Sequence, residues 1–171
     1  MAALQSNRPD PAAGLAGKYL TFRLGSGRYG VSVLRVREII RPTAFTPTPG
    51  MPAYMLGVIN LRGRIIPVAD LRGRFGMEPA PSLDLACIIV VELGGGTQPP
   101  LTMGLRVDAL DEVLNVAADE VQEPPRFGVA CATEHLRGMA KSKGLVTTLL
   151  DLDRLLGGEE LAAIRATQSA G

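Results

Sequence analysis

The sequence has no tryptophan, only 4% aromatic residues, two cysteines and one histidine. So few aromatic side chains argue against a base-stacking surface of the kind that binds single-stranded nucleic acid. Cys87 and Cys131 lie far apart in apolar surroundings, without metal-ligand spacing, so buried free thiols are favoured over a disulfide or a metal site. His135 has no cysteine or carboxylate at ligand spacing and is expected to be structural or exposed. The sequence therefore predicts no metal and no cofactor.

An excess of charge of one sign is also missing. The 18 basic and 17 acidic residues leave a net charge of +1, which gives no electrostatic reason to expect nucleic acid or an anionic membrane as a partner. The longest apolar run, residues 85–91, is too short to span a bilayer. Residues 1–11 lack the basic and apolar regions of a secretory signal. We therefore expect a cytoplasmic protein without membrane insertion.

Catalytic motifs are scarce as well. The sequence has no GxSxG, no P-loop and no HExxH. Residues 25–30 fit GxGxxG, but a dinucleotide site needs a helix directly afterwards, whereas residues 31–33 favour a strand and Glu38 comes too early. Asp70 and Asp151 each precede a leucine at the start of a short predicted turn, so helix capping is favoured over a catalytic carboxylate pair. A binding module is therefore favoured over an enzyme.

What the sequence does contain is short strands, tight turns and little signal for long helices, which indicates a mainly β fold. Strands are predicted at residues 19–24, 29–33, 34–40, 54–71 (a hairpin), 85–93, 101–105 and 145–150. The hairpin turns at Asn60-Leu61-Arg62-Gly63, where Asn and Gly are expected to supply the positive φ of a tight turn. Short helical turns are predicted at residues 71–75 and 117–122, and a short terminal helix at residues 159–167.

An internal repeat organises the chain. Residues 30–40 align with residues 104–114 at an offset of 74, and a second pair of segments aligns at an offset of 81. In that second pair, Gly57, Gly63, Asp70, Leu71 and Gly76 fall on Gly138, Gly144, Asp151, Leu152 and Gly157. Matched glycines imply matched turns, because glycine is costly where the backbone does not need it. The repeat predicts two similar small barrels.

The predicted organisation is one domain over residues 17–158, with lobes at residues 17–83 and 84–158. A disordered tail (residues 1–16) precedes it, and a helix and tail (residues 159–171) follow. The hairpin tip is where the repeats differ, because Lys141-Ser142-Lys143 replaces Asn60-Leu61-Arg62. Arg62 is therefore predicted to make a specific contact; the alternative is a polar tip that is only solvated.

Four stretches together resemble CheW-type coupling domains: Tyr29-Gly30-Val31 through Ile40, Gly57-Val58-Ile59-Asn60-Leu61-Arg62-Gly63 with the Pro-Val-x-Asp-Leu that follows, Gly104-Leu105-Arg106-Val107-Asp108, and Leu150-Asp151-Leu152-Asp153-Arg154-Leu155-Leu156. The resemblance runs from residue 18 to residue 156. It implies two five-stranded SH3-like β-barrel lobes that form one CheW-like domain.

The resemblance further implies a scaffold without catalytic activity. Such a protein links chemoreceptors to a CheA-type histidine kinase, whose regulatory domain has the same two-lobe fold. The receptor's helical hairpin tip is expected in an apolar groove between lobes. Seven positions match residues implicated in partner binding in the family: Val36, Glu38, Gly57, Arg62, Leu110, Val113 and Gly138.

Alternatives remain open for these positions and for the function. Core packing is the alternative for Val36, Leu110 and Val113, and turn geometry is the alternative for the two glycines. The adaptor is expected to serve flagellar chemotaxis or a non-flagellar chemosensory pathway. An alternative function of a different class is that of a β-barrel that binds oligonucleotides or a small ligand.

Overall fold

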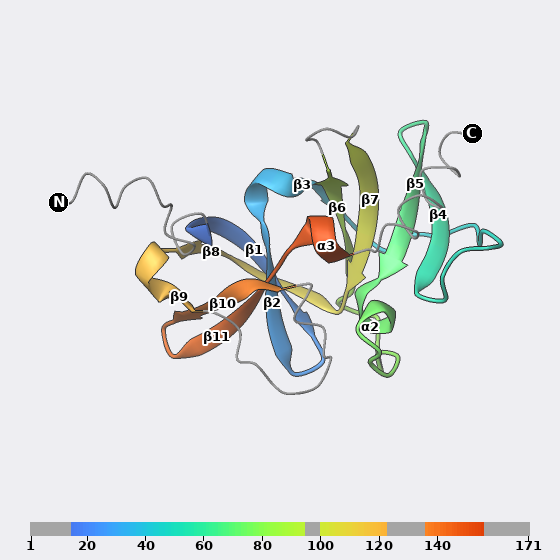
Figure 1. Cartoon of the computed structure of the whole chain (residues 1–171). Coiled ribbons are helices and arrows are strands. Elements are labelled where there is room, and N and C mark those ends of the chain that lie inside the picture. The colour runs from blue at the N-terminus through green and yellow to red at the C-terminus, as the bar shows by residue number, and fades with distance from the viewer. Residues whose placement is uncertain (1–14, 95–99, 123–135, 156–171) are drawn as a thin grey trace.

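The computed structural model describes residues 15–94, 100–122 and 136–155, which form mainly β-strands (Figure 1). Most of the predicted N-terminal tail, the predicted terminal helix, Cys131 and His135 lie outside these residues. The elements are β1 (Gly17–Leu24), β2 (Gly27–Ser32), the 3-10 helix η2 (Val33–Arg35), β3 (Val36–Ile40), β4 (Met55–Leu61), β5 (Arg64–Asp70), α2 (Leu71–Arg74), β6 (Cys87–Leu93), β7 (Leu101–Val107), β8 (Ala109–Val116), the 3-10 helix η3 (Ala118–Glu120), β9 (Val121–Gln122), β10 (Leu136–Ser142), β11 (Leu145–Leu150) and α3 (Leu152–Leu155). The predicted mainly β fold with short helices is confirmed.

The strands form two sheets that make two lobes side by side (Figure 1). The β4–β5 lobe is the sheet with strand order β3-β6-β7-β5-β4, and the β10–β11 lobe is the sheet with order β8-β1-β2-β11-β10-β9. The β4–β5 lobe has the five strands that were predicted. The other lobe carries β9 as a sixth strand of only two residues.

The lobes do not follow the chain, and the predicted division into residues 17–83 and 84–158 is wrong as a description of the sheets. β1 pairs with β8 and β2 with β11, whereas β3 pairs with β6. The cause lies in two short connections, which we call crossovers because each leads the chain from one sheet into the other. η2 leads from β2 into β3 of the other lobe, and Asp108 alone separates β7 from β8. One residue is too short for a hairpin turn, so the chain runs on into the other sheet.

The repeat is nevertheless present in three dimensions. Gly30 of β2 pairs with Leu149 of β11, and Gly104 of β7 pairs with Val68 of β5. These two pairs are related by the sequence offsets of 74 and 81. Equivalent strands therefore occupy equivalent places in the two sheets, and each repeat gives strands to both.

The buried apolar side chains of the described residues gather in three clusters. The largest joins both lobes and includes Phe22 of β1, Leu71 of α2 and Leu155 of α3, all with no exposed surface. Smaller clusters fill the interior of each lobe, around Val68 in one and Leu149 in the other. Because the largest cluster is shared, the two lobes form one folding unit.

The glycines of the GxGxxG pattern lie in a hairpin. Residues 25 and 26 connect β1 to β2, and residues 27–30 pair with residues 21–24. The strand signal after these glycines therefore predicts the local structure correctly, and the geometry is unlike a strand-to-helix phosphate loop.

Candidate partner-binding site

The β4–β5 hairpin begins with a bulge and ends in a two-residue turn. The pairing register shifts between Met55 and Gly57. At the tip, Arg62 and Gly63 have φ angles of 54° and 84°, as a type I′ turn requires. The prediction that Asn60 supplies a positive φ is wrong: Asn60 lies in β4 and its Oδ1 accepts the N–H of Gly63 at 2.9 Å. An arginine therefore takes the left-handed position at the end of the hairpin.

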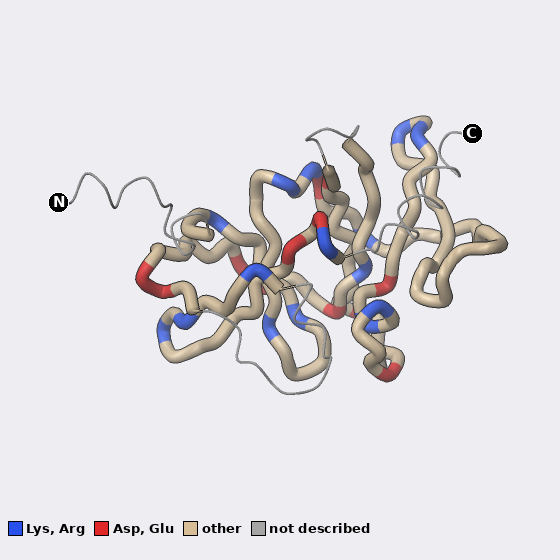
Figure 2. Tube along the Cα trace, in the orientation of Figure 1, with Lys and Arg blue, Asp and Glu red and all other residues tan. Residues whose placement is uncertain are grey.

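Arg62 reaches from this tip toward the outer strand β3. Its Nη2 lies 3.4 Å from Oε1 of Glu38, and the two side chains are 80% and 27% exposed. The pair borders a hollow of about 240 Å³ that is lined in part by the buried Ile66 and Val90. Figure 2 shows basic residues at this hairpin tip, which carries Arg62 in the turn and Arg64 at the start of β5. Such an exposed pair adds little to stability, so its charges are available to a partner.

The apolar residues predicted for the site lie on the outer strands of the two sheets. Leu110 and Val113 of β8 are 38% and 56% exposed, so core packing does not account for them. Val36 of β3 is half-buried and packs against the largest apolar cluster. For Val36 the structure therefore shows a packing contact, with part of the side chain still reachable from solvent.

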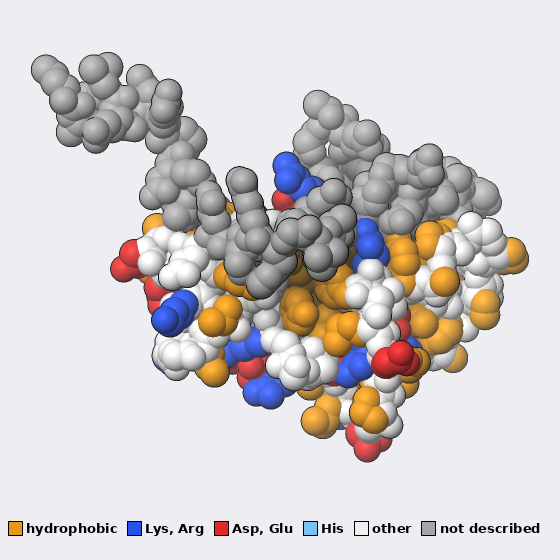
Figure 3. Space-filling model, turned by 60° about the horizontal axis from the view of Figure 1, so that its bottom comes forward, with side chains coloured by type: hydrophobic (Ala, Val, Ile, Leu, Met, Phe, Trp, Pro, Cys, Tyr) orange, Lys and Arg blue, Asp and Glu red, His pale blue; other side chains and the backbone are white. Residues whose placement is uncertain are grey.

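Sequence reasoning missed further exposed apolar residues, and three of them are related by the repeat to each other or to a predicted site residue. Ile39 of β3, Ile65 of β5 and Val146 of β11 are 42%, 48% and 53% exposed. Ile39 is the repeat equivalent of Val113, and Ile65 is the equivalent of Val146, at the offsets of 74 and 81. Applying the offset of 74 to Val113 would have found Ile39, whereas Ile65 and Val146 correspond only to each other. Figure 3 shows apolar side chains exposed in the centre of one face and over the β4–β5 lobe.

Gly57 and Gly138 are buried, and each lies where another part of the backbone comes close. Gly57 has a φ of 140°, and a Cβ there would lie 2.2 Å from the carbonyl oxygen of Thr46. A Cβ on Gly138 would lie 3.1 Å from the carbonyl oxygen of Gln122. Both residues sit where the register shifts between their paired strands, so each glycine lets a neighbouring backbone come close.

The predicted site residues form two equivalent groups, one on each lobe. The β4–β5 lobe carries Val36, Glu38, Gly57 and Arg62, and the β10–β11 lobe carries Leu110, Val113 and Gly138. Within these groups, Glu38 and Arg62 form a direct ion pair. The seven predicted positions are therefore divided between the two sheets.

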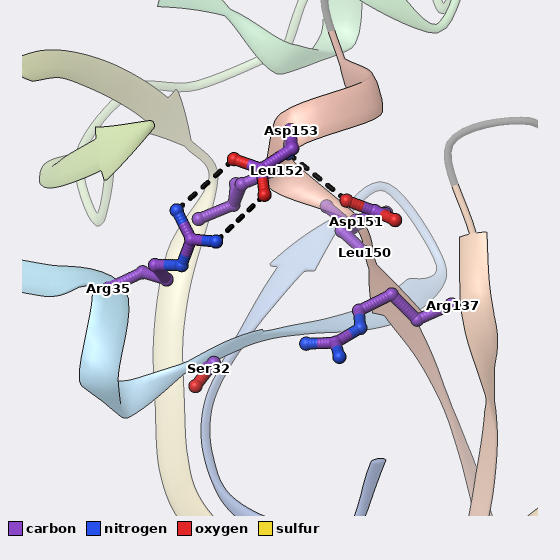
Figure 4. A pocket seen from close by; sticks show the side chains of 7 residues that line it. All are labelled: Ser32, Arg35, Arg137, Leu150, Asp151, Leu152 and Asp153. Carbon is purple, nitrogen blue, oxygen red and sulfur yellow. Dashed lines mark hydrogen bonds and ion pairs between the residues drawn. The ribbon is translucent and has the colours of Figure 1, made fainter. Parts of the chain in front are cut away.

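A second hollow, of about 120 Å³, lies where η2 meets α3 (Figure 4). Arg35 donates two hydrogen bonds to Asp153, at 3.1 and 2.7 Å, and Asp151 accepts the backbone N–H of Asp153 at 3.1 Å. Arg137 extends into the hollow from β10 (Figure 4). The volume is far below the roughly 300 Å³ at which small-molecule pockets begin. We therefore assign this hollow to ion pairing and not to a ligand.

The most buried ion pair of the described chain joins Arg72 of α2 to Asp108 at the β7–β8 crossover. Arg72 Nη2 lies 2.6 Å from Asp108 Oδ2, and the side chains are 11% and 20% exposed. The hydrogen bond from Arg72, together with the N–H of Gly25, lowers the pKa of the Asp108 carboxyl below its usual value, although burial opposes this. The pair is therefore fully charged at neutral pH.

The two predicted helix caps turn out differently. Asp70 forms no side-chain cap on α2, so that prediction is wrong; its Oδ2 pairs with Nη2 of Arg106 at 3.3 Å instead. Asp151 does accept the N–H of Asp153 at the start of α3, which confirms the cap there.

The described residues show little that resembles a reaction centre. Burial raises the pKa of the Cys87 thiol to about 11, which keeps it protonated and unreactive. Within the described ranges, no group of three or more His, Cys, Asp and Glu residues could hold a metal ion. No helix in those same ranges is long and apolar enough to cross a membrane. The arrangement offers exposed edges and a charged hairpin tip, which suit binding to another protein.

A family model described as the CheW-like domain matches residues 18–160 of the chain. The chain belongs to the CheW-like family. It is 33% identical over 147 residues to Chemotaxis protein CheW of Klebsiella aerogenes, covering 86% of each chain. It is 35% identical over 144 residues to Chemotaxis protein CheW of Rhizobium meliloti, covering 84% of this chain and 90% of the relative. A solved structure, the scaffolding protein TtCheW from Thermoanaerobacter tengcongensis, has a TM-score of 0.74 at 31% identity and covers 85% of this chain and 95% of its own.

These likenesses confirm the predicted fold of two SH3-like lobes and the predicted adaptor class. The CheW-like match spans both lobes and both crossovers, so the exchange of strands between the lobes belongs to the matched domain. The CheW-like chain is accordingly a scaffold of the chemotaxis signalling type.

Proposed function

We propose that this CheW-like domain is a non-catalytic cytoplasmic adaptor that couples a CheA-type histidine kinase to chemoreceptors. Its partners are the regulatory domain of the kinase and the cytoplasmic tip of the receptor, at receptor arrays beneath the membrane. The even charge balance and the scarcity of aromatics disfavour the alternative of an oligonucleotide-binding barrel.

The partner surfaces are the two groups of residues already described. On the β4–β5 lobe, Glu38 and Arg62 form a charged rim beside the half-buried Val36. On the β10–β11 lobe, Leu110 and Val113 present an apolar outer strand. Charged rims fix the orientation of a partner, and apolar edges provide most of the affinity. Gly57 and Gly138 act indirectly, by keeping the bulges of the β4–β5 and β10–β11 hairpins.

One observation carries the proposal most strongly: Arg62 is held in a left-handed conformation at an exposed tip and is aimed at Glu38. Its repeat equivalent, Lys143, has the same φ of 54°. Among the described residues, Lys143 forms no ion pair, and Glu112, the equivalent of Glu38, pairs with Arg28 at 2.9 Å. The backbone is thus repeated while the charge arrangement is specific to one lobe.

Calorimetric titration of the full chain with a CheA-type regulatory domain, and separately with a receptor-tip fragment, tests the proposal. We expect both fragments to bind. Arg62→Ala should weaken at least one of the two interactions about tenfold and lower kinase activation in reconstituted receptor arrays. The matched control is Lys143→Ala, which should leave both affinities within about twofold.

Failure of the purified chain to bind either fragment would contradict the proposal. Salt-sensitive binding of an oligonucleotide in the same assay would favour the nucleic-acid alternative instead. Activation of a kinase from a flagellar or a non-flagellar pathway in the reconstituted array would identify which type of pathway the adaptor serves.

A further inference from the structure

Two ion-pair clusters hold the two crossovers between the lobes, and their helix residues are related by the repeat. The first contains Arg72 of α2 and Asp108 of the β7–β8 crossover. The second contains Arg35 of the η2 crossover and Asp153 of α3. Arg72 and Asp153 are equivalent residues at the offset of 81, and each is the second residue of its short helix. We call these two clusters the α2 clamp and the α3 clamp.

The clamps bind equivalent backbone groups. In the α2 clamp, Asp108 accepts the N–H of Gly25 at 2.7 Å, and its own N–H donates to the carbonyl oxygen of Arg23 at 3.1 Å. Both of these residues lie at the end of β1. The clamp therefore ties a helix that follows β5 of one lobe to a strand end of the other lobe.

In the α3 clamp, Asp153 accepts the N–H of Gly94 at 2.9 Å, and Arg35 donates to the carbonyl oxygen of Glu92 at 3.2 Å. Gly94 and Glu92 lie at the end of β6, the strand equivalent to β1. The clamp therefore ties a helix that follows β11 to a strand end of the β4–β5 lobe.

The two clamps have opposite polarity. The α2 clamp places the arginine on the helix and the aspartate on the crossover, whereas the α3 clamp places the aspartate on the helix and the arginine on the crossover. A wrong pairing of helix and crossover would bring Arg72 to Arg35 or Asp153 to Asp108. Like charges disfavour such a pairing, so the polarity specifies which helix docks on which crossover in a chain built from two similar repeats.

We propose that the two clamps position the outer strands that carry the partner-binding residues. Arg35 directly precedes Val36 of β3, and Asp108 directly precedes β8 with Leu110. The clamps thus fix the points at which these strands leave the crossovers. This inference rests on the proposed function only in taking β3 and β8 to bind partners. The effect of the clamps on the positions of these two strands can be measured in the chain without partners.

The test measures backbone hydrogen–deuterium exchange of the full chain, without partners, in peptides that cover residues 36–40 and residues 109–116. Arg35→Asp places like charges in the α3 clamp and should speed exchange in residues 36–40 about tenfold, with less than about twofold change in residues 109–116. Asp108→Arg should have the opposite selectivity. If Asp108→Arg does not fold, Arg72→Lys replaces it, because lysine keeps the charge but cannot form both bonds.

The reversed pairs provide the rescue that distinguishes positioning from general stability. The two clamps show that either polarity can join such a helix to a crossover, so the doubly substituted chains R35D/D153R and R72D/D108R should return exchange to within about threefold of the unsubstituted chain. Equal acceleration in both peptides, no acceleration, or failure of both reversed pairs to rescue would overturn the proposal. Affinity of the unsubstituted chain for a CheA-type regulatory domain, measured separately, tests the proposed function, so the two ideas can fail independently.

Discussion

The two hairpins at the ends of the molecule, β4–β5 and β10–β11, have the same backbone and different side chains. Both begin with a register shift, at Gly57 in one and at Gly138 in the other. Both end in a turn whose first residue, Arg62 or Lys143, has a φ of 54°. A basic residue in a left-handed conformation is unfavourable compared with asparagine or glycine, yet it occurs at both tips.

The hairpins differ in their contacts with the neighbouring strands of their own lobe. In the β4–β5 lobe the tip arginine reaches Glu38 on the outer strand. In the β10–β11 lobe the equivalent glutamate, Glu112, pairs with Arg28, and β9 is added beside β10. The comparison shows that the repeat preserves the backbone of the hairpins, while the glutamate of the outer strand has a different ion-pair partner in each lobe. Substitutions at equivalent positions should therefore give unequal effects.

The largest expected difference concerns the two bulge glycines. Gly57→Ala should lower the free energy of unfolding by about 3 kcal/mol or more, because the new Cβ would lie 2.2 Å from the Thr46 carbonyl oxygen at a φ of 140°. Gly138→Ala should cost about 1 kcal/mol, because its nearest contact is 3.1 Å and a small shift relieves it. Urea unfolding of both variants measures the difference. Equal losses would show that the two bulges are under the same constraint.

The next largest difference concerns the two clamps. Asp108→Ala should lower the free energy of unfolding by about 2 to 3 kcal/mol, since it leaves a mostly buried Arg72 without its carboxylate partner and with the carbonyl oxygen of Glu78 as its remaining acceptor. Asp153→Ala should cost less than about 1 kcal/mol, because Arg35 and Asp153 are 35% and 45% exposed and water replaces the lost bonds. Thermal and urea unfolding check the ranking. A larger loss at Asp153 would mean that burial does not set the strength of the clamps.

The pH dependence of stability should test the contribution of the Asp108 charge in the α2 clamp. The hydrogen bond from Arg72 lowers the pKa of Asp108 in the folded chain below its ordinary value of 3.8. Its contribution is therefore present above the ordinary pKa and is lost as the pH falls through the lowered pKa. Between pH 6 and pH 3, the stability advantage of the unsubstituted chain over Asp108→Asn should shrink. An advantage that stays constant over this range would show that the charge of Asp108 is not what stabilises the fold.

The local structure of this chain was largely predictable, because alternation and glycine placement act over a few residues. The hairpin at residues 54–71, the buried strand before residue 93 and the repeat offsets all appear in the structure. The assignment of strands to lobes was not predictable, since it depends on whether two short connections, η2 and Asp108, turn the chain back or let it continue into the other sheet. The Asp70 cap failed for a related reason: its partner, Arg106, lies 36 residues away in sequence.

The candidate site, too, was predictable only in its local features. Arg62 could be singled out from the sequence because the repeat holds the frame constant and the tip differs. Its contact with Glu38 joins opposite edges of the sheet. The alternation of apolar and polar residues along a strand does not indicate such a contact between distant strands. The clamps escaped prediction because each links a helix, a crossover and a strand end that are separated by 36 to 118 residues along the chain.

The smallest expected effect on stability is the one that best isolates function. Arg62→Asn and Lys143→Asn should each raise the free energy of unfolding by up to about 0.5 kcal/mol, because asparagine adopts the left-handed turn position more readily and neither lost charge contributes much at an exposed tip. Only Arg62→Asn should weaken binding of the kinase or receptor fragment in titration calorimetry. A gain in stability together with a loss of binding at residue 62, and a gain without loss at residue 143, would show that the strained arginine is retained for the partner. If both variants bind normally, the charge at the tip is not part of the contact, and the apolar outer strands remain as the surface to examine.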